Sequence, residues 1–556
     1  MAYYPPGSTR LICRCKLASA VQKVWLPAPP QEQQLWSSAA TAARALALSL
    51  VLEQLLRVCP GVKKVYVLVR PKRGVFPHER LQRLLAGPLF HLHQQGQVGK
   101  PSQCIIEALE GDILQPACGL SPEDQRRLHS EVDLVVHAAA SIKFEDHIHQ
   151  SLLHNYVATR HVADLAGEMS HAKALVHIST AYVNSHLPKG SLVHERIYPL
   201  SIPTTAQHRA QLTHAQVHEP PPKAAVRVAD EADPAAELAA RGPVPGTAGR
   251  PGSWHAELAG RLLSLPSDEP DVQAQRLLRH TGFPNAYCLT KHMAEALLAE
   301  RHLKPCPVAI VRPSIIGSVA LRPLPGYVGN KSGATGAALA IATGLAAYTC
   351  HQPKNPIDIV PADLVASAVL ACAAEAMQGH LNSHASPSIV HVCTSDCHPI
   401  TTAQFYTGIL AYFARHPPPH RLALGRYPQY GGRNIVGAGW QLTCRNAAEN
   451  VKFATVAAVL RVGGQGRAAS QVLSGWKAWR TYNTPALDFN LRFEVSRLEH
   501  LEARLDPGER SDQLKLSWDP EVDSWEDYMA VYMGGLDRFC FKREPLAPAA
   551  PAQVRV

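Results

Sequence analysis

The sequence predicts an α/β fold: a doubly wound parallel sheet of the Rossmann type, followed by a smaller, mostly helical C-terminal domain. Short apolar runs typical of buried parallel strands recur along the first 400 residues. Stretches with helical apolar spacing separate these runs. Several of the runs end in small or hydroxyl-bearing residues, at the strand ends where open α/β sheets bind ligands.

Composition narrows the class of partner. The chain has 556 residues, 46% apolar and 18% charged, which is typical of a soluble globular protein of two or three domains. Its formal net charge of +10 favours an anionic partner such as a nucleotide phosphate, a coenzyme or a membrane surface. No basic run interleaved with aromatic residues is present, so we expect no nucleic acid partner. The cysteines and histidines lack metal-binding spacing, so we expect no metal site.

The first strand-like run follows an atypical N-terminal segment, residues 1–44. A helical pattern begins near Leu46, and the apolar run 64–69 comes after it. Arg70 and Lys72 follow that run. Basic side chains just past a strand suit an adenosine 2′-phosphate, although a solvated loop would look the same.

Three further strands are expected at 104–109, 132–136 and 174–178, with a helix over 149–168 before the last of them. Asp112 follows the first, where it can meet an adenine or ribose edge. Small side chains follow the second and would let a flat cofactor approach the backbone, and hydroxyls follow the third. These residues are Ala138 and Ala140, and then Ser179 and Thr180.

Residues 203–280 interrupt this alternation. Their Pro- and Ala-rich composition predicts a low-complexity insertion, with one short helix near 255–264. Strands are expected again at 307–311, just before Pro313, and at 389–392. The sheet domain is therefore predicted to span 45–395 and the helical domain 396–556.

A helix that follows the insertion carries the chemistry. Leu289, Met293 and Leu297 recur every four residues, which predicts a buried stripe. Tyr287 and Lys291 stand one turn apart on another face and can share a site. A nearby ammonium favours phenolate, so this tyrosine could exchange a proton with a carbonyl oxygen near neutral pH. An ordinary helix surface is the alternative, because Tyr-x3-Lys also occurs by chance.

Read together, these stretches resemble the fatty acyl-CoA reductases, which are extended members of the short-chain dehydrogenase/reductase superfamily. The similarity covers about 50–540 except the insertion. Its motifs, in chain order, are Val65-Tyr-Val-Leu-Val-Arg70-Pro-Lys72, Val136-His-Ala-Ala-Ala140-Ser-Ile-Lys143-Phe144, Val176-His-Ile-Ser179-Thr180-Ala-Tyr182-Val-Asn184, Tyr287-x3-Lys291, Ile310-Val-Arg312-Pro313-Ser314-Ile-Ile-Gly317, Asp358-Ile-Val-Pro361-Ala-Asp363 and Asp523-Ser-Trp525-Glu-Asp-Tyr528.

This resemblance implies that NADPH reduces a long-chain fatty acyl-CoA to a primary fatty alcohol through an aldehyde, with release of CoA. In such a site Lys291 would hold the nicotinamide ribose, Tyr287 would act as general acid, and Thr180, or else Ser179, would bind the same oxygen. The remaining implied cofactor contacts are Arg70 and Lys72 to the 2′-phosphate, Asp112 to the adenine, Ala138 and Ala140 along the cofactor, and Pro313 near the nicotinamide.

The chain departs from the family at its first turn. Family members carry a Gly-rich turn between the first strand and helix, which brings the pyrophosphate onto a helix N-terminus. Here Gly7 is the only glycine before Gly61. We therefore expect the first strand and turn to be missing, either through loss or because the N-terminus is a misassigned translation joined to the helix near Leu46. Either way, NADPH should bind poorly.

Other functions and locations stay open. A reductase that stops at the aldehyde, a sterol or sugar dehydrogenase, and a catalytically impaired relative that binds acyl chains or a partner are the alternatives. The expected location is intracellular and membrane-associated, at the endoplasmic reticulum or peroxisome, because the substrate is a lipid. A plastid is also considered, because the segment before Glu32 is basic. No apolar run reaches membrane-spanning length, and the sequence does not indicate the oligomeric state.

Overall fold

The computed structural model describes most of the chain, and statements about its structure refer to these residues. They are 23–27, 39–59, 61–71, 74–95, 104–141, 144, 146–200, 253–264, 277–279, 281–301, 306–329, 331–346, 348–379, 387–419, 435–437, 439–505, 514–518 and 523–543.

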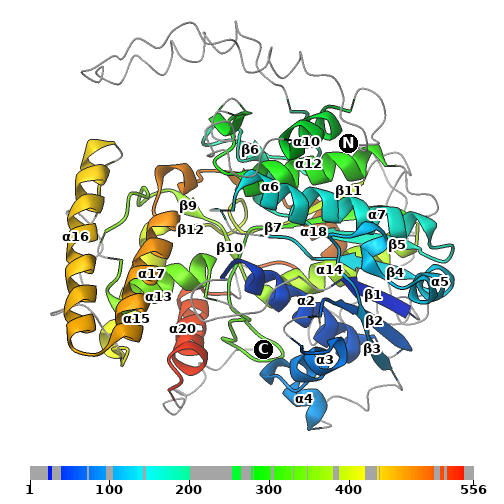
Figure 1. Cartoon of the computed structure of the whole chain (residues 1–556), viewed down its shortest axis with the longest axis horizontal. Coiled ribbons are helices and arrows are strands. Elements are labelled where there is room, and N and C mark those ends of the chain that lie inside the picture. Colours follow the sequence, from blue (N-terminus) through cyan, green and yellow to red (C-terminus); the bar gives the residue numbers. More distant parts are fainter. Residues whose placement is uncertain are drawn as a thin grey trace, which may run out of the picture.

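A seven-stranded sheet forms the centre of the molecule, in the order β11-β7-β5-β4-β1-β2-β3 (Figure 1). Its neighbouring strands all pair in parallel. The order reverses between β1 and β4, and such a switch point is where open α/β sheets bind ligands. The predicted doubly wound sheet is confirmed. The strands are β1 (Lys23–Pro27), β2 (Lys64–Val69), β3 (Ile105–Glu110), β4 (Leu134–His137), β5 (Ala174–Ile178), β7 (Val308–Pro313) and β11 (Ser388–Val392).

The first strand, which the sequence was expected to lack, is present. β1 pairs with β2 from Lys23 opposite Lys64 onward, and with β4 at Val24 opposite Leu134. Its sequence gave a weak signal, because the five residues begin with a lysine and end with a proline. The expectation of a missing strand was therefore wrong. The Gly-rich turn is still absent from the sequence, since no glycine stands between β1 and Gly61.

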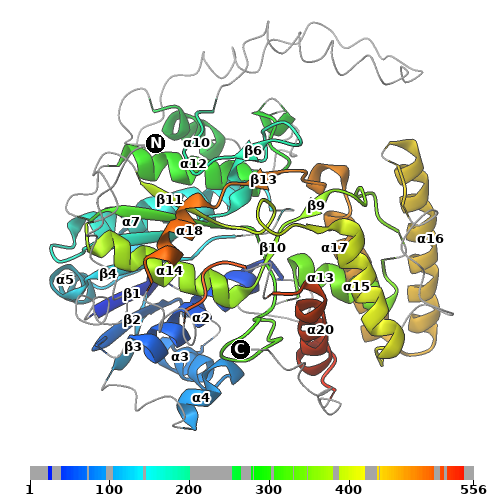
Figure 2. The ribbon, with the colours of Figure 1, turned by 180° about the vertical axis from the view of Figure 1, so that it is seen from behind.

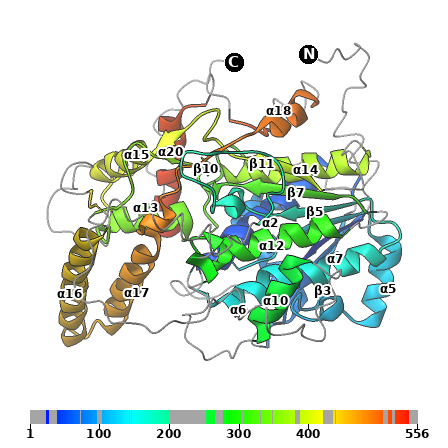
Figure 3. The same ribbon diagram turned by 90° about the horizontal axis from the view of Figure 1, so that it is seen from above.

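Helices cover both faces of the sheet (Figure 3). α2 (Ala39–Val58) and α14 (Ala362–Met377) cover one face, and α5 (Pro122–Glu131), α7 (Ala158–Glu168) and α12 (Ala286–Glu300) lie on the other. Successive strand residues point to opposite faces, so the valines of β2 join the core under α2, whereas Tyr66 and Leu68 join the core under α5 and α7.

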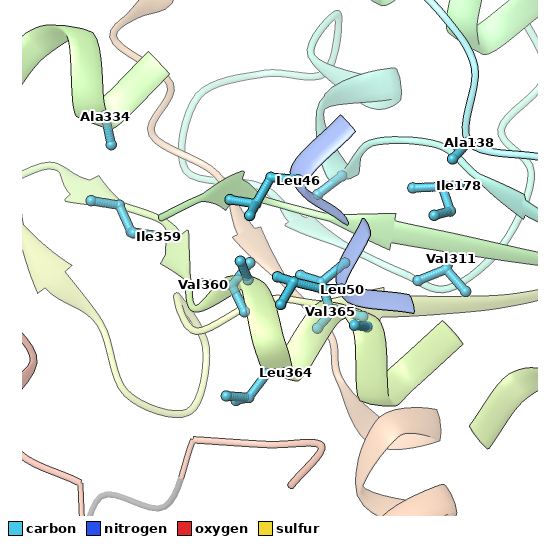
Figure 4. Packing of buried hydrophobic residues seen from close by; sticks show 14 of the residues in the cluster. Leu46, Leu50, Ala138, Ile178, Val311, Ala334, Ile359, Val360, Leu364 and Val365 are labelled. Atoms are coloured by element: carbon cyan, nitrogen blue, oxygen red, sulfur yellow. The ribbon is translucent and has the colours of Figure 1, made fainter. Parts of the chain in front are cut away.

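The core beneath α2 fixes this helix against α14. Leu46 and Leu50 pack among Val360, Leu364 and Val365 (Figure 4). A polar contact adds to this packing, because Gln54 Nε2 of α2 donates to the backbone oxygen of Asp363 at 3.0 Å. The helix predicted near Leu46 thus has the position expected of the helix after the first strand of a Rossmann sheet.

Shorter elements complete the sheet domain. They are α3 (Pro77–Leu85), η1 (Pro88–Phe90), α4 (His91–Gln94), η2 (Pro116–Gly119), α6 (Ile148–Ser151), the π-helix η3 (Leu152–Val157), η4 (Ala181–Asn184), β6 (Leu192–Val193), α10 (Trp254–Ser264), β8 (Ile315–Ile316), β9 (Pro356–Ile357) and β10 (Ile359–Val360).

α10 confirms the short helix predicted within the insertion, whose parts 203–252 and 265–276 lie outside the described residues. It packs against α6 and α12. His255 is buried there, 2.9 Å from Tyr156 Oη through Nδ1 and 2.8 Å from Glu300 Oε2 through Nε2. This part of the insertion therefore supports α12.

The C-terminal region is mostly helical, as predicted. Most of its helices gather beyond one end of the sheet (Figure 2), whereas α18 packs against β11 and α14. α13 packs against α15 and α17, although it precedes the predicted boundary at residue 396. No helix of the described ranges is both long and apolar enough to cross a membrane. The elements are α13 (Gly333–Thr343), β12 (Ile400–Thr401), α15 (Thr402–Arg415), α16 (Trp440–Val462), α17 (Gly466–Tyr482), η7 (Pro485–Leu487), β13 (Arg492–Phe493), α18 (Ser496–Ala503), α20 (Trp525–Gly535) and η8 (Leu536–Cys540).

Candidate active site

α12 carries the Tyr-x3-Lys pair. The helix begins after Asn285, whose side-chain oxygen accepts a hydrogen bond from the backbone N–H of Cys288 at 2.9 Å. Side chains from Ala286 to Leu298 are buried on every face. Tyr287 is only 7% exposed and Lys291 is fully buried, so an ordinary exposed helix surface is excluded. A buried ammonium is costly unless it is hydrogen-bonded, which points to specific partners for Lys291.

Those partners lie on β5. Lys291 Nζ donates to the backbone oxygen of Ile178 at 3.1 Å and lies 2.9 Å from His177 Nε2. Ile178 is the last residue of β5, and Ser179 and Thr180 follow it. The lysine thus holds α12 at the carboxyl end of β5, beside both hydroxyl residues. The sheet and this helix bring the two predicted groups of side chains together.

Tyr287 lies one turn before Lys291 and borders an aromatic wall. Its ring centroid is 5.7 Å from that of Phe144, which in turn lies 5.9 Å from the ring of Tyr482 at the end of α17. The C-terminal helices therefore reach the site, and they give the tyrosine an apolar neighbourhood suited to a hydrocarbon chain.

Ser179 and Thr180 can both serve an incoming oxygen. Ser179 is buried, and its Oγ has no hydrogen-bond partner among the described residues. Thr180 Oγ1 accepts from the backbone N–H of Tyr182 at 3.3 Å, which leaves its own hydroxyl proton to donate. A buried hydroxyl without a partner is costly, so this end of β5 is prepared for a polar ligand group.

Polar residues behind the lysine escaped the sequence analysis. The ring of His137 in β4 lies 5.0 Å from that of His177, and His137 Nε2 is 3.1 Å from Thr159 Oγ1. That threonine donates to the backbone oxygen of Asn155 at 2.6 Å, so it accepts from His137. The available signal was a histidine inside each of two buried apolar runs, where a polar side chain needs a partner.

Asn155 links this group back to α12. It lies in the π-helix η3, its Oδ1 accepts from the backbone N–H of Ser141 at 2.8 Å, and its Nδ2 donates to Thr290 Oγ1 at 3.0 Å. Thr290 directly precedes Lys291. π-Helical turns are common at functional sites, and this one fixes the loop after β4 against α12.

The residues predicted to bind the adenosine end form their own pair. Arg70 Nη1 lies 3.4 Å from Asp112 Oδ2, at the carboxyl ends of the adjacent strands β2 and β3. Both side chains are partly exposed, so the pair remains accessible to a ligand. Gly111, which directly precedes Asp112, allows the chain after β3 to lie close to Leu68 of β2, because a Cβ atom on Gly111 would lie 2.5 Å from Leu68 Cδ1. Lys72 lies outside the described residues.

Small and rigid residues lie at the carboxyl ends of β4 and β7. Ala138 and Ala140 are each 1% exposed and follow β4, which is a neighbour of β1. Pro313 is buried at the end of β7, opposite Val392 of β11. All three lie at the carboxyl edge of the sheet, as the sequence predicted. None has a long side chain that would fill the space for a ligand at this edge.

A nicotinamide nucleotide fits the β4–β5 side of this edge. The buried Lys291 ammonium and the small residues after β4 match a sugar and a flat ring in their donors and in their size. The β1–α2 connection, in contrast, offers no glycine for close approach of a pyrophosphate. In the described part of the chain, no group of three or more His, Cys, Asp or Glu side chains could hold a metal ion.

His292, which directly follows Lys291, predicts that the folded protein loses stability in acid. Burial, aided by the neighbouring His186, lowers the pKa of His292 to about 4. An imidazole with a lowered folded-state pKa binds fewer protons folded than unfolded, so the free energy of unfolding falls as pH falls from about 6.5 to 4. We expect His292 to contribute about 3 kcal/mol of this loss. Glu295 and Arg312 also face this ring and act in opposite directions.

Urea unfolding at pH 7 and pH 5 would measure this loss of unfolding free energy. His292→Phe keeps a ring among its aromatic neighbours Trp254 and Phe283 and should flatten the pH dependence. Other buried histidines also have lowered pKa values, so the comparison is the difference in slope between the two proteins. Equal slopes would contradict the assignment to His292.

The sheet order and the arrangement at β4, β5 and α12 are those of a Rossmann-like nucleotide-binding domain. A model of the male sterility protein family of NAD-binding domains matches residues 49–369, more than half of the chain. The chain belongs to this family.

Curated relatives carry the name inferred from the sequence motifs. Fatty acyl-CoA reductase 1 of Xenopus laevis is 27% identical over 379 residues, which are 68% of this chain and 61% of the frog protein. Fatty acyl-CoA reductase 2 of Bos taurus is 24% identical over 510 residues, 91% of this chain and 84% of the bovine one. The resemblance to fatty acyl-CoA reductases is thereby confirmed. The match to the frog protein spans about three-fifths of its length.

Solved structures agree on the fold. The terminal R domain from the myxalamid PKS-NRPS biosynthetic pathway superposes with a TM-score of 0.52 at 16% identity, covering 95% of this chain and 93% of that domain. The reductase domain of a nonribosomal peptide synthetase from Mycobacterium tuberculosis gives 0.51 at 15% identity, covering 95% and 96%. At these identities the likeness concerns the fold alone.

Proposed function

We propose that this protein is an NADPH-dependent fatty acyl-CoA reductase that converts a long-chain fatty acyl-CoA to a primary fatty alcohol through an aldehyde and releases CoA. The observation that supports the proposal most directly is the contact of Lys291 Nζ with the backbone oxygen of Ile178, because Ser179 and Thr180 follow Ile178 in the chain. The curated relatives' names support the substrate class.

In this proposal each residue has a defined role. The bound nicotinamide supplies the hydride. Tyr287 Oη donates a proton to the oxygen that develops negative charge, and the Lys291 ammonium stabilises the phenolate left behind. Ser179 and Thr180 donate hydrogen bonds to the same oxygen and orient the carbonyl. His177, whose Nε2 lies 2.9 Å from Lys291 Nζ, positions the ammonium.

A covalent cysteine route is disfavoured. Cys288 is the cysteine next to Tyr287, and burial raises the pKa of its thiol to about 12, so it is protonated at neutral pH and a poor nucleophile. No covalent cysteine intermediate is required, because reduction of the thioester gives a hemithioacetal that collapses to the aldehyde and CoA. The second reduction then uses the same proton donor.

The test is product analysis. Purified protein is incubated with palmitoyl-CoA and NADPH, and lipids are extracted. Fatty alcohol with free CoA supports the proposal, and aldehyde as the sole product would favour an enzyme that stops after one step. If neither alcohol nor aldehyde forms while the protein still binds palmitoyl-CoA, the protein is a catalytically impaired acyl binder. The absence of glycine from the β1–α2 connection favours that alternative hypothesis.

The preference for NADPH over NADH gives a separate prediction. Arg70 is partly exposed beside Asp112 and carries the charge that a 2′-phosphate needs. Arg70→Ala should weaken NADPH binding about tenfold or more and leave NADH within about twofold, since a charge-assisted hydrogen bond contributes roughly 1.5–3 kcal/mol. Nucleotide fluorescence titration measures both affinities.

The matched control for that prediction is Arg83→Ala, which removes a basic side chain from the exposed surface of the neighbouring helix α3. Its effect on both nucleotides should be small. Equal losses of NADPH and NADH affinity on changing Arg70 would show that this arginine does not meet the 2′-phosphate.

A further inference from the structure

α16 has an exposed apolar face. Trp440, Val451 and Val462 are 73%, 68% and 91% exposed. They are spaced by eleven residues, about three helical turns, so they lie along one line of the helix. Val459, 66% exposed, lies beside that line. Alanines occupy many of the other exposed positions of the helix. We call the four named residues the outer face of α16.

The opposite face of α16 is already packed. Leu442, Phe453 and Ala457 are buried on that side, and the ring of Phe453 lies 4.8 Å from Trp476 of α17. A surface helix of a globular protein normally has one apolar stripe, which faces the core. α16 has two, and the outer one points away from α17. In all three views α16 is the outermost helix (Figures 1–3).

The exposed charge of α16 and α17 is positive. Residues 440–482 contain one acidic residue, Glu449, which is buried and contacts Arg445 at 3.2 Å and Lys452 at 3.0 Å. The basic side chains of α16 and α17 are all exposed: Arg445, Lys452, Arg461, Arg467, Lys477 and Arg480. Exposed tryptophan and valine flanked by lysine and arginine are typical of helices that lie in a membrane interface.

We propose that the outer face of α16 docks on the surface of an anionic phospholipid membrane. The apolar side chains would enter the headgroup boundary, and the exposed Lys and Arg side chains of α16 would pair with lipid phosphates and carboxylates. A second copy of this chain is a poorer occupant, because two such faces would bring like charges together. A spanning role is not needed, since none of the described helices meets the requirements for crossing.

The docking face connects to the active site through α17. This helix runs from Gly466, near the end of α16, to Tyr482, over roughly 25 Å. Tyr482 contacts Phe144, and Phe144 contacts Tyr287. Given the proposed function, on which this step rests, the arrangement places an aromatic wall between the lipid surface and the proton donor. The docking itself is independent of the reaction.

Vesicle flotation of the full chain tests the docking without an activity assay. Wild-type protein should float with phosphatidylcholine vesicles that contain about 30% phosphatidylserine, and much less with phosphatidylcholine alone. Val451→Glu with Val462→Glu should lower the partition coefficient about tenfold or more. The matched control is Phe76→Glu with Leu321→Glu, which places the same charges at two other exposed apolar residues and should stay within about twofold.

Two further measurements separate docking from unfolding of the variants and test the contribution of charge. Thermal unfolding should show both double variants as stable as wild type, because all four side chains are exposed. Lys452→Gln with Arg461→Gln, both on exposed positions of α16, should remove most of the dependence on phosphatidylserine while keeping the helix apolar. The proposal is overturned if wild-type protein does not float, or if both glutamate variants lose vesicle binding to the same extent. It is also overturned if sedimentation shows a dimer that only the α16 glutamate variant abolishes.

Discussion

Tyr287→Phe should lower fatty alcohol formation roughly a hundredfold to ten-thousandfold, the range expected for loss of a general acid. The change removes one hydroxyl from a buried ring that keeps its contact with Phe144, so the fold should be retained. Lys291→Ala should cost a similar factor, because its ammonium favours the phenolate form of the tyrosine. Product extraction after incubation with acyl-CoA and NADPH measures both losses.

The double variant distinguishes one proton-transfer unit from two separate effects. Groups that act in the same step are non-additive, so Tyr287→Phe with Lys291→Ala should be little worse than either change alone. Tyr406→Phe in α15 is the control for loss of a buried phenol hydroxyl, and it should leave alcohol output near that of wild type. Near wild-type output from Tyr287→Phe would remove the catalytic assignment. If the native chain is inactive, the same series requires a variant with a Gly-rich turn restored between β1 and α2.

The sheet was largely predictable because the strands β2, β4, β5, β7 and β11 are buried on both faces. Continuous apolar runs such as 64–69 and 174–178 identify parallel strands without any tertiary information. β1 was missed for the opposite reason: its lysine and proline leave only three apolar residues to signal a strand. Its place in the sheet comes from pairing with β2 and β4, which sequence periodicity alone does not report.

The candidate site was predictable only in part. Spacing placed Tyr287 and Lys291 one turn apart, and strand ends placed Ser179 and Thr180 at the ligand edge, but no local pattern relates α12 to β5. That relation depends on the contact of Lys291 with His177 and Ile178, across more than a hundred residues of sequence. Asn155 and the aromatic wall were missed likewise, because their roles arise from neighbours distant in the chain.

A buried ion pair also holds α12 on the sheet and yields the largest stability prediction. Arg312 of β7 and Glu295 of α12 are both essentially unexposed, and their closest atoms, Nη2 and Oε2, are 2.6 Å apart. Arg312 also donates to the backbone oxygen of Arg196 at 3.1 Å and lies 3.1 Å from His391 Nε2. Glu295 stands one turn after Lys291, so this pair fixes the same helix that carries the site.

Arg312→Met should lower the free energy of unfolding by about 3–5 kcal/mol, because it leaves the Glu295 carboxylate buried without its cation. Arg312→Met combined with Glu295→Met should recover a large part of that loss, since replacing both partners of a buried pair by apolar groups can be nearly neutral. Arg127→Met is the control: Arg127 bonds Glu107 at 2.7 Å, but both side chains are 31% exposed, so at most about 1 kcal/mol is expected. Urea unfolding at pH 7 provides all three values. A loss for Arg312→Met no larger than that for Arg127→Met would mean that the Glu295 carboxylate is neutralised by other means, and that the pair does not fix α12 to β7.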